Sequence, residues 1–326
     1  MTVAVLCLRP KVDFERAGAL PPAGLQIAYR SPGDADVPAL MKQARALIIP
    51  AVGPKLSLSL FENSSIKFVQ VTGAGLDRLD LSLLKQKGIA VANVLGGSNA
   101  AVAEYVVTAA SVLLRRFAWA DAEIRAGRYG EVRAKMIADN LAGLDGLIVG
   151  IVGLGMIGLA VAEAFHKRGC KICYYDLAPR DPRAADALGA KSVSLEEVLR
   201  SADLVTLHLP LLPATQGLIG GRELAAMKPG AILIQASRGG IVDEKGLAGS
   251  LKSGHLGGAA IDVYSTEPPT ADNPLLALDG EAARRVLFTP HIAGVTRQSS
   301  TYLFQAAWRN VERVLINNEP PLDRVC

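Results

Sequence analysis

Short apolar runs alternate along the chain with polar and helix-like segments, and this alternation predicts an α/β protein. A first series of strand-like runs lies at residues 2–8, 25–29, 46–49, 66–71 and 89–92. A second series lies at residues 147–152, 171–175, 191–193, 204–209, 231–235, 258–264 and 286–289. Helix-like segments separate most runs of the second series, which predicts a doubly wound parallel sheet. Runs rich in Val, Ile and Leu are typical of strands that helices cover on both faces.

Two longer stretches show the spacing of helices. Apolar residues recur every three or four positions from Val102 to Phe117 and predict one helix from Ser98 toward Gly127. A looser stretch follows up to residue 146. The amphipathic segment from Thr296 to Asn317 predicts a last helix, whose apolar face must pack against another part of the chain.

The length of 326 residues exceeds what one compact core usually holds, so we expect two domains. Hydrophobic residues make up 50% of the chain and charged residues 20%, which suits buried strands covered by helices. The net charge of +4 is small and spread out, and it argues against nucleic acid as the main partner. The densest basic stretch, from Arg115 to Lys135, is interrupted by acids and is typical of a solvated or interface helix.

The first apolar run has no charged region before it, and Pro10 ends it before any cleavage-site pattern. We therefore expect a strand here and no signal peptide. The uncharged window at residues 146–162 contains glycines and a turn, so it predicts a strand and a helix start and no membrane span.

The 4 cysteines, Cys7, Cys170, Cys173 and Cys326, do not form the framework of a disulfide-rich secreted protein. This favours a reducing compartment, the cytoplasm. Cys170 and Cys173 form a lone C-x-x-C at the start of a strand, where residues three apart point to opposite faces. We interpret them as buried residues and expect no metal site.

The most informative motif is Gly153-x-Gly155-x-x-Gly158, which follows one strand-like run and opens a helix-like segment. The first glycine permits a tight turn, the second lets the backbone approach a pyrophosphate, and the third lets helix and strand pack closely. Glycines that only pack an α/β turn are the alternative.

Asp176 ends the next strand, where a carboxylate accepts from a ribose 2′-hydroxyl and repels a 2′-phosphate, so NAD is favoured over NADP. Arg180 follows and is interpreted as a loop charge.

Three later strands are followed by side chains suited to hydride transfer. Arg238, Glu267 and His291 each come after a strand of the second series. The carboxyl ends of parallel strands form the edge where ligands bind. An arginine can hold a substrate carboxylate, a histidine can exchange a proton with a carbonyl oxygen, and a carboxylate can orient the histidine. His208 also ends a strand and is the alternative acid/base.

The chain resembles the D-isomer-specific 2-hydroxyacid dehydrogenases over nearly its whole length, and most specifically from Gly146 onward. Matching segments lie in order at 153–158, 208–211, 237–244, 262–269 and 289–294. The resemblance implies Arg238, Glu267 and His291 as catalytic residues. The NAD contacts that it implies come from Met156, Ile157, Asp176, Leu209, Ala236, Ser237, Arg238, Asp262, His291 and Gly294, in addition to the glycines of the motif, with Asp262 near the nicotinamide amide.

The same resemblance implies an architecture. A Rossmann-like NAD-binding domain would span residues 98–291, and a flavodoxin-like substrate domain would combine residues 1–97 and 292–326. The active site of such enzymes lies in the cleft between the domains, and the long helix after the first crossover helps to form a homodimer. We expect a small-molecule acid as the substrate and no membrane partner.

In the first series, Gly73-Ala74-Gly75 resembles the glycine loop whose N–H groups hold the substrate carboxylate in this family. A simple turn after a strand is the alternative. Pro50 and Val71 replace the arginines that bind phosphate in the phosphoglycerate dehydrogenase branch. We therefore expect a small 2-keto acid such as glyoxylate, hydroxypyruvate or pyruvate, because no cation is evident for a second anionic group.

Other functions stay open at this point. Corepressors of the same fold bind NAD and partner peptides, and phosphoglycerate, formate and phosphite dehydrogenases have related folds. The complete set of Arg238, Glu267 and His291 favours a dehydrogenase over a binding protein.

Overall fold

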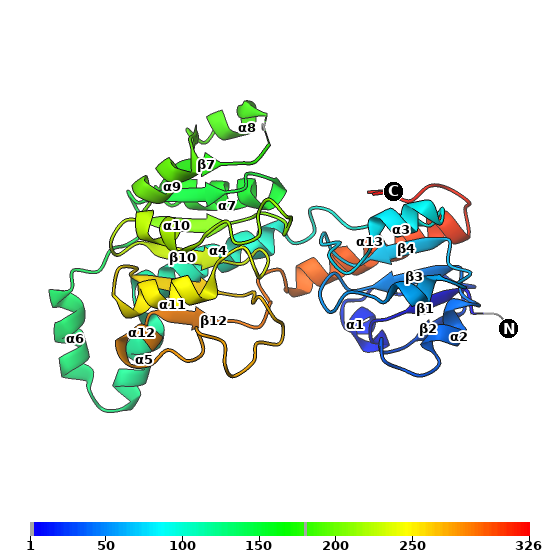
Figure 1. Cartoon of the computed structure of the whole chain (residues 1–326), viewed down its shortest axis with the longest axis horizontal. Coiled ribbons are helices and arrows are strands. Elements are labelled where there is room, and N and C mark those ends of the chain that lie inside the picture. The colour runs from blue at the N-terminus through cyan, green and yellow to red at the C-terminus, as the bar shows by residue number, and fades with distance from the viewer. Residues whose placement is uncertain (1–2, 179–180) are drawn as a thin grey trace. The chain divides into compact units, whose positions relative to one another are not determined.

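The computed structural model describes residues 3–178 and 181–326, and Arg180 lies outside them. The chain forms two compact units (Figure 1). Unit 1 contains the residues up to Ser98 together with Val295–Cys326, and unit 2 contains Asn99–Gly294. The boundaries expected from the sequence lie after residues 97 and 291.

Unit 2 is built on a parallel sheet, seven-stranded within the described residues, in the order β12-β11-β10-β9-β6-β7-β8. The strands are β6 (Ile148–Val152), β7 (Lys171–Tyr175), β8 (Lys191–Ser192), β9 (Leu204–Leu207), β10 (Ile232–Gln235), β11 (Gly258–Ile261) and β12 (Val286–Phe288). The order from β8 to β11 is that of dinucleotide-binding sheets. The predicted Rossmann-like fold is confirmed.

Helices cover both faces of this sheet (Figure 1). They are α4 (Asn99–Leu114), α7 (Met156–His166), α8 (Pro182–Asp186), α9 (Leu195–Ser201), α10 (Gly221–Ala226), α11 (Glu244–Lys252) and α12 (Gly280–Ala283). Val106 on α4 and Val161 on α7 are buried in one core cluster with Ile151 of β6. Leu247 on α11 lies in the cluster on the other face, with Leu207 of β9 and Leu233 of β10.

The prediction of one helix from Ser98 toward Gly127 is wrong. Arg116 adopts a left-handed conformation, with φ of 50°, and separates α4 from α5 (Phe117–Arg125). A further helix, α6 (Tyr129–Ala138), lies in the stretch that lacked a regular pattern. Few residues of α5 and α6 are buried, so their apolar spacing gave little signal. Several basic residues here are paired with acids, for example Arg128 with Glu123 and Arg125 with Asp121.

Unit 1 contains a second parallel sheet, five-stranded in the described part of the chain, in the order β2-β1-β3-β4-β5. The strands are β1 (Val5–Cys7), β2 (Ile27–Tyr29), β3 (Ala46–Ile49), β4 (Phe68–Val71) and β5 (Ala90–Ala92). Its helices are α1 (Lys11–Arg16), α2 (Val37–Met41), η1 (Leu58–Phe61), α3 (Leu81–Gln86) and α13 (Arg297–Leu315). This is the strand order of flavodoxin-like sheets, as expected.

The predicted last helix is α13, and it packs on the sheet of unit 1. Phe304 and Trp308 of α13 are buried against Phe14 of α1, with ring centroids 4.8 Å and 5.1 Å from that of Phe14. The two ends of the chain therefore share one hydrophobic core, which explains why the amphipathic pattern at the C-terminus belongs to unit 1.

Cys7, Cys170 and Cys173 are buried, as interpreted, and the described cysteines are free thiols. Burial raises the pKa of Cys170 to about 11, which keeps that thiol protonated at neutral pH. None of the described helices is long and apolar enough to cross a membrane.

Candidate active site

The glycine turn between β6 and α7 has two glycines that the packing of the chain itself requires. Gly153 has φ of +98°, and a Cβ there would lie 2.6 Å from the carbonyl oxygen of His208. A Cβ on Gly158 would lie 2.0 Å from the carbonyl oxygen of Gly153. Gly155 differs, because a Cβ there would meet nothing within 4 Å. A ligand that approaches the backbone closely accounts for glycine at this position.

Asp176 follows β7 and organises the same turn. Its Oδ2 accepts a hydrogen bond from the N–H of Leu154 at 2.7 Å, and its Oδ1 accepts from the N–H of Ala178 at 3.0 Å. A carboxylate in this place, at the end of the strand beside the glycine turn, suits a ribose hydroxyl as a donor. Gly155 caps α7 without a side-chain hydrogen bond, and the first N–H groups of this 11-residue helix suit a pyrophosphate. The residues present therefore fit NAD.

The turn after β10 carries Arg238 and is held by a buried glutamine. The side chain of Gln235 donates to the carbonyl oxygen of Arg238 at 2.8 Å and accepts from the hydroxyl of Ser237 at 2.7 Å. Arg238 is half-buried, and its Nη1 donates to the carbonyl oxygen of Ser237 at 2.7 Å. A Cβ on Gly239 would lie 1.8 Å from the carbonyl oxygen of Tyr264, so the turn packs directly on the segment after β11.

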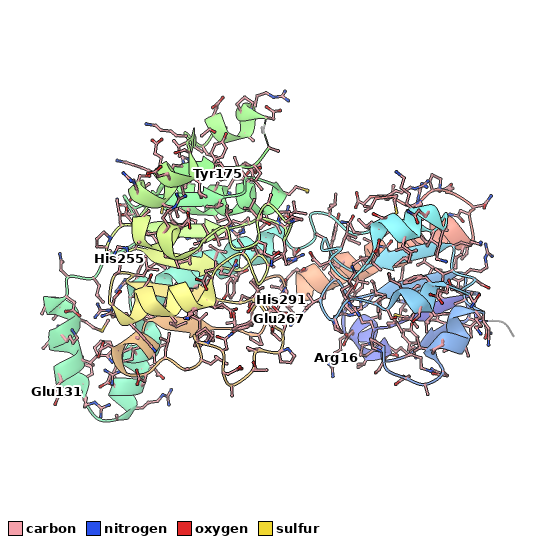
Figure 2. The ribbon with its side chains drawn as sticks, in the orientation of Figure 1. Arg16, Glu131, Tyr175, His255, Glu267 and His291 are labelled. Atoms are coloured by element: carbon pink, nitrogen blue, oxygen red, sulfur yellow. The ribbon has the colours of Figure 1, made fainter. Side chains whose placement is uncertain are left out.

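His291 and Glu267 form a pair, which Figure 2 shows side by side. The distance from Nδ1 of His291 to Oε2 of Glu267 is 2.8 Å, and both side chains are partly exposed. Oε1 of Glu267 accepts from the N–H of Tyr264 at 3.1 Å. The contact fixes Nδ1 of the ring on the carboxylate and leaves Nε2 for another partner.

The backbone around His291 depends on Asp262, which is only 1% exposed. Oδ1 of Asp262 accepts from the N–H of Ile292 at 2.8 Å, and Oδ2 accepts from the N–H of Ala293 at 2.8 Å. The carbonyl oxygen of Asp262 accepts from the N–H of His291 at 2.8 Å, and His291 has φ of 55°. Asp262 therefore positions the loop that carries His291. Its expected contact with the nicotinamide amide stays a prediction.

Two further side chains of this network were not predicted from the sequence. The hydroxyl of Thr289 donates to Oδ1 of Asp262 at 2.6 Å, and the hydroxyl of Tyr105 on α4 lies 2.7 Å from the Thr289 oxygen. Burial raises the pKa of Tyr105 to about 12, so this hydroxyl keeps its proton. No local pattern links Tyr105 to Thr289, because only the tertiary fold brings them together.

Glu244 at the start of α11 was also missed as a positioning residue. Its Oε1 accepts from the N–H of Ser265 at 2.8 Å, and its Oε2 accepts from the hydroxyl of Ser265 at 2.8 Å and from the side chain of Asn273 at 2.9 Å. Glu244 thereby holds the segment that carries Glu267.

His208 is held differently from His291. Its Nε2 lies 3.0 Å from the hydroxyl of Thr206. Burial lowers the pKa of His208 to about 3, so the ring is neutral at pH 7 and has no extra proton to give. These features favour His291 as the acid/base.

The remaining predicted cofactor residues lie along the same edge of the sheet. Leu209 and Ser237 are buried, Ile157, Ala236 and Gly294 are partly buried, and Met156 is exposed. Leu209 packs against Gly153, since a Cβ on that glycine would lie 2.8 Å from its Cδ2.

In unit 1, the predicted substrate loop follows β4. A Cβ on Gly73 would lie 2.8 Å from that of Ala51, and the carbonyl oxygen of Ala74 accepts from the side chain of Asn93 at 2.9 Å. Among the residues that the structure describes, none accepts a hydrogen bond from the N–H groups of Ala74 and Gly75. These groups are available to a carboxylate.

The expectation that the end of β3 has no cation nearby is wrong. Nη1 of Arg78 donates to the carbonyl oxygen of Pro50 at 3.0 Å. Val71, in contrast, is 1% exposed and belongs to the core of unit 1, so this position does not present a side chain to a ligand.

Comparisons with known proteins agree with this geometry. Residues 107–293 match the family model described as D-isomer specific 2-hydroxyacid dehydrogenase, NAD binding domain. The chain is 38% identical over 244 residues to the (S)-sulfolactate dehydrogenase of Chromohalobacter salexigens, with 74% of this chain and 75% of the relative covered. It is 36% identical over 235 residues to the D-3-phosphoglycerate dehydrogenase of Archaeoglobus fulgidus, with 72% of this chain and 42% of that relative covered.

The chain spans less than half the length of this phosphoglycerate dehydrogenase. A solved structure of D-mandelate dehydrogenase from Rhodotorula graminis matches with a TM-score of 0.82 and 26% identity, and covers 100% of this chain and 98% of its own. The resemblance inferred from the motifs is confirmed. The chain belongs to the D-isomer specific 2-hydroxyacid dehydrogenase family, and residues 107–293 match the NAD binding domain of that family.

Proposed function

We propose that the protein is an NAD-dependent dehydrogenase that interconverts a small 2-keto acid and a D-2-hydroxy acid. The observation that carries the proposal is the His291–Glu267 pair, whose Nδ1 and Oε2 are 2.8 Å apart, at the carboxyl ends of strands that also present Arg238. β10, β11 and β12 are neighbours in the sheet, so Arg238, Glu267 and His291 follow adjacent strands. The glycine turn after β6 lies at the same edge.

Under this proposal, unit 2 is the NAD-binding domain. Gly153, Gly155 and Gly158 form the turn for the pyrophosphate, and Asp176 accepts from the adenosine ribose. The contacts expected from the resemblance complete the site: Met156, Ile157, Leu209, Ala236, Ser237, Arg238, Asp262, His291 and Gly294. When bound, the nicotinamide supplies or accepts the hydride.

The residues of the chain then hold the acid and move the proton. The guanidinium of Arg238 binds the substrate carboxylate with charge-assisted hydrogen bonds. Nε2 of His291 gives a proton to the carbonyl oxygen during reduction and takes it back during oxidation. Glu267 holds the other ring nitrogen and stabilises the charged imidazolium.

We assign unit 1 the role of substrate domain. The N–H groups of the loop Gly73-Ala74-Gly75 are suited to the substrate carboxylate. The carbonyl oxygens of Gly73 and Ala74 accept hydrogen bonds from the chain, whereas no acceptor in the described chain binds the N–H groups of Ala74 and Gly75. Loop amides give a carboxylate directional binding without a side chain that must be ordered.

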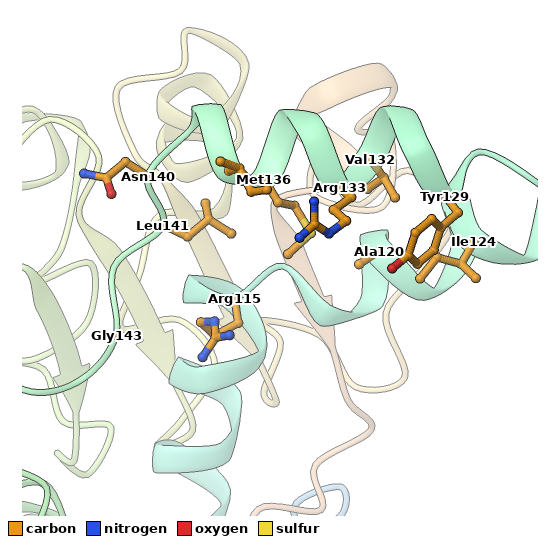
Figure 3. A pocket seen from close by; sticks show the side chains of 11 residues that line it. Arg115, Ala120, Ile124, Tyr129, Val132, Arg133, Met136, Asn140, Leu141 and Gly143 are labelled. Atoms are coloured by element: carbon orange, nitrogen blue, oxygen red, sulfur yellow. The ribbon is translucent and has the colours of Figure 1, made fainter.

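We infer that a second copy of the chain covers α5 and α6. An open pocket of 540 Å³ lies along these helices and is lined by apolar and basic side chains (Figure 3). Phe117, Ile124, Tyr129 and Ile137 are exposed there. An apolar surface of this kind, away from the catalytic residues, suits a homodimer.

We also propose a cytoplasmic location, because the buried free thiols suit a reducing compartment.

The proposal is tested by following NADH and NADPH at 340 nm, with the purified protein and a panel of 2-keto acids. We expect turnover with NADH and a D-configured product. NADH binding without turnover of any acid would support the corepressor alternative instead. Oxidation of formate or phosphite without reduction of keto acids would assign a different dehydrogenase activity.

A further inference from the structure

Arg78 in unit 1 lies at the ligand-binding edge of a sheet. Its Nε donates to the carbonyl oxygen of Pro54 at 2.9 Å, and its Nη1 donates to that of Pro50 at 3.0 Å. Pro50 directly follows β3, and β3 pairs with β4, the strand that leads into the loop at Gly73. The guanidinium therefore lies at the carboxyl ends of two adjacent parallel strands, where open α/β sheets bind their ligands.

The charge of Arg78 is buried, and within residues 3–178 and 181–326 no counter-ion is paired with it. The residue is 3% exposed, and no described carboxylate forms an ion pair with it. Two of its five N–H groups bind carbonyl oxygens, and no residue in the described ranges accepts from Nη2. A buried cation with only carbonyl partners is costly, so an anion that reaches it gains a strong, poorly hydrated partner.

The neighbouring backbone packs closely on this guanidinium. Gly53 has φ of +128°, and a Cβ there would lie 3.3 Å from Cζ of Arg78. Glycine is therefore favoured both by the backbone conformation and by the guanidinium. The segment from Pro50 to Pro54 is shaped around Arg78.

We propose that Arg78 recognises a second oxyanion on the substrate, carried at or beyond C3 of the 2-keto acid. The inference rests on the proposed function. There, the loop at Gly73 in the same unit holds the first carboxylate, so the charge of Arg78 is left for a further group. A guanidinium binds carboxylate, sulfonate and phosphate oxygens alike, and the experiment distinguishes these sources.

The experiment compares keto acids with and without the second charge. Oxaloacetate and 2-oxobutyrate have the same number of carbons, and 3-sulfopyruvate and phosphohydroxypyruvate test the other oxyanions. We expect kcat/KM with NADH to be at least about tenfold higher for one of the three dianions than for 2-oxobutyrate. Arg78→Met should abolish this preference, and Arg78→Lys should keep part of it. Arg16→Met, at an exposed arginine of the same unit, is the matched control and should keep it fully.

A purely structural role predicts a different result. Loss of the hydrogen bonds to Pro50 and Pro54 alone would lower kcat/KM for both classes of acid by the same factor and leave their ratio unchanged. That result, or a wild-type enzyme without preference for a dianion, would overturn the proposal. If Arg78→Met fails to fold, the proposal is judged from two other measurements. These are the ratio of kcat/KM for the dianion over 2-oxobutyrate in the wild-type enzyme and the same ratio in Arg78→Lys. Absence of turnover with every keto acid would reject the proposed function itself.

Discussion

His291 differs from the other candidate acid/base, His208, in the partner of its ring. Glu267 lies 2.8 Å from Nδ1 of His291, whereas His208 contacts the neutral hydroxyl of Thr206. We predict that His291→Asn lowers kcat by about 10²- to 10⁴-fold and leaves NADH binding nearly unchanged. Steady-state kinetics and fluorescence titration with NADH measure the two effects.

His208→Gln is the control for this measurement. Burial lowers the pKa of His208 to about 3, so its removal takes away no protonated group at neutral pH. Near-normal turnover of His291→Asn together with a large loss in His208→Gln would reverse the assignment.

Glu267→Gln should lower turnover more than cofactor binding. The amide keeps the size of the side chain but removes the negative charge 2.8 Å from Nδ1 of His291, so the imidazolium formed during catalysis loses its partner. We expect kcat for keto-acid reduction to fall by about tenfold or more while NADH binding stays nearly unchanged. An unchanged kcat would leave Glu267 only a structural role.

At the scale of elements, the turn between β6 and α7 is bonded to Asp176 at the end of β7, and we propose that the two together select the cofactor. Asp176→Ala should weaken NADH binding and raise the ratio of kcat/KM for NADPH over NADH, because the carboxylate that opposes a 2′-phosphate is lost. The ratio is measured with one keto acid at saturation. Equal use of both cofactors by the unmodified protein would contradict the role of Asp176.

The sequence pattern predicted helices and strands well where their buried side chains recur at a regular spacing. The strands of both sheets and α13 were expected because their apolar residues face a core. The break between α4 and α5 was not expected. An arginine such as Arg116 rarely marks a left-handed turn, and the helix that follows is exposed, so its apolar pattern is weak. Arg238, Glu267 and His291 could be named as candidates from the sequence because each follows a strand of the second series.

The supporting side chains could not be found in the same way. Tyr105 meets Thr289 across 184 positions of sequence, and Arg78 meets Pro50 across 28. Such contacts depend on how helices and loops are placed on a sheet. The spacing of residues along the chain does not predict that placement. The mistaken expectation of a site without a cation near Pro50 has this cause.

At the scale of the whole molecule, the assembly is the next property to test. We expect the protein to sediment as a dimer at micromolar concentration and Ile137→Glu to sediment as a monomer, because a charge would be buried in the apolar surface of α6. Leu20→Glu introduces the same charge at an exposed leucine of unit 1 and should stay dimeric. A monomeric wild-type protein would exclude the proposed interface.

Both carboxylate oxygens of Asp262 act as hydrogen-bond acceptors, so the residue type at this position can be used to compare members of the family. The N–H groups of Ile292 and Ala293 donate to different oxygens of the carboxylate, so an asparagine would turn its NH₂ group toward one of these donors. A substitution that preserves shape would therefore disorder the loop of His291 while the sheet survives. Homologous genes that encode an amide at this position are expected to descend from enzymes that have given up hydride transfer and kept the fold for another purpose.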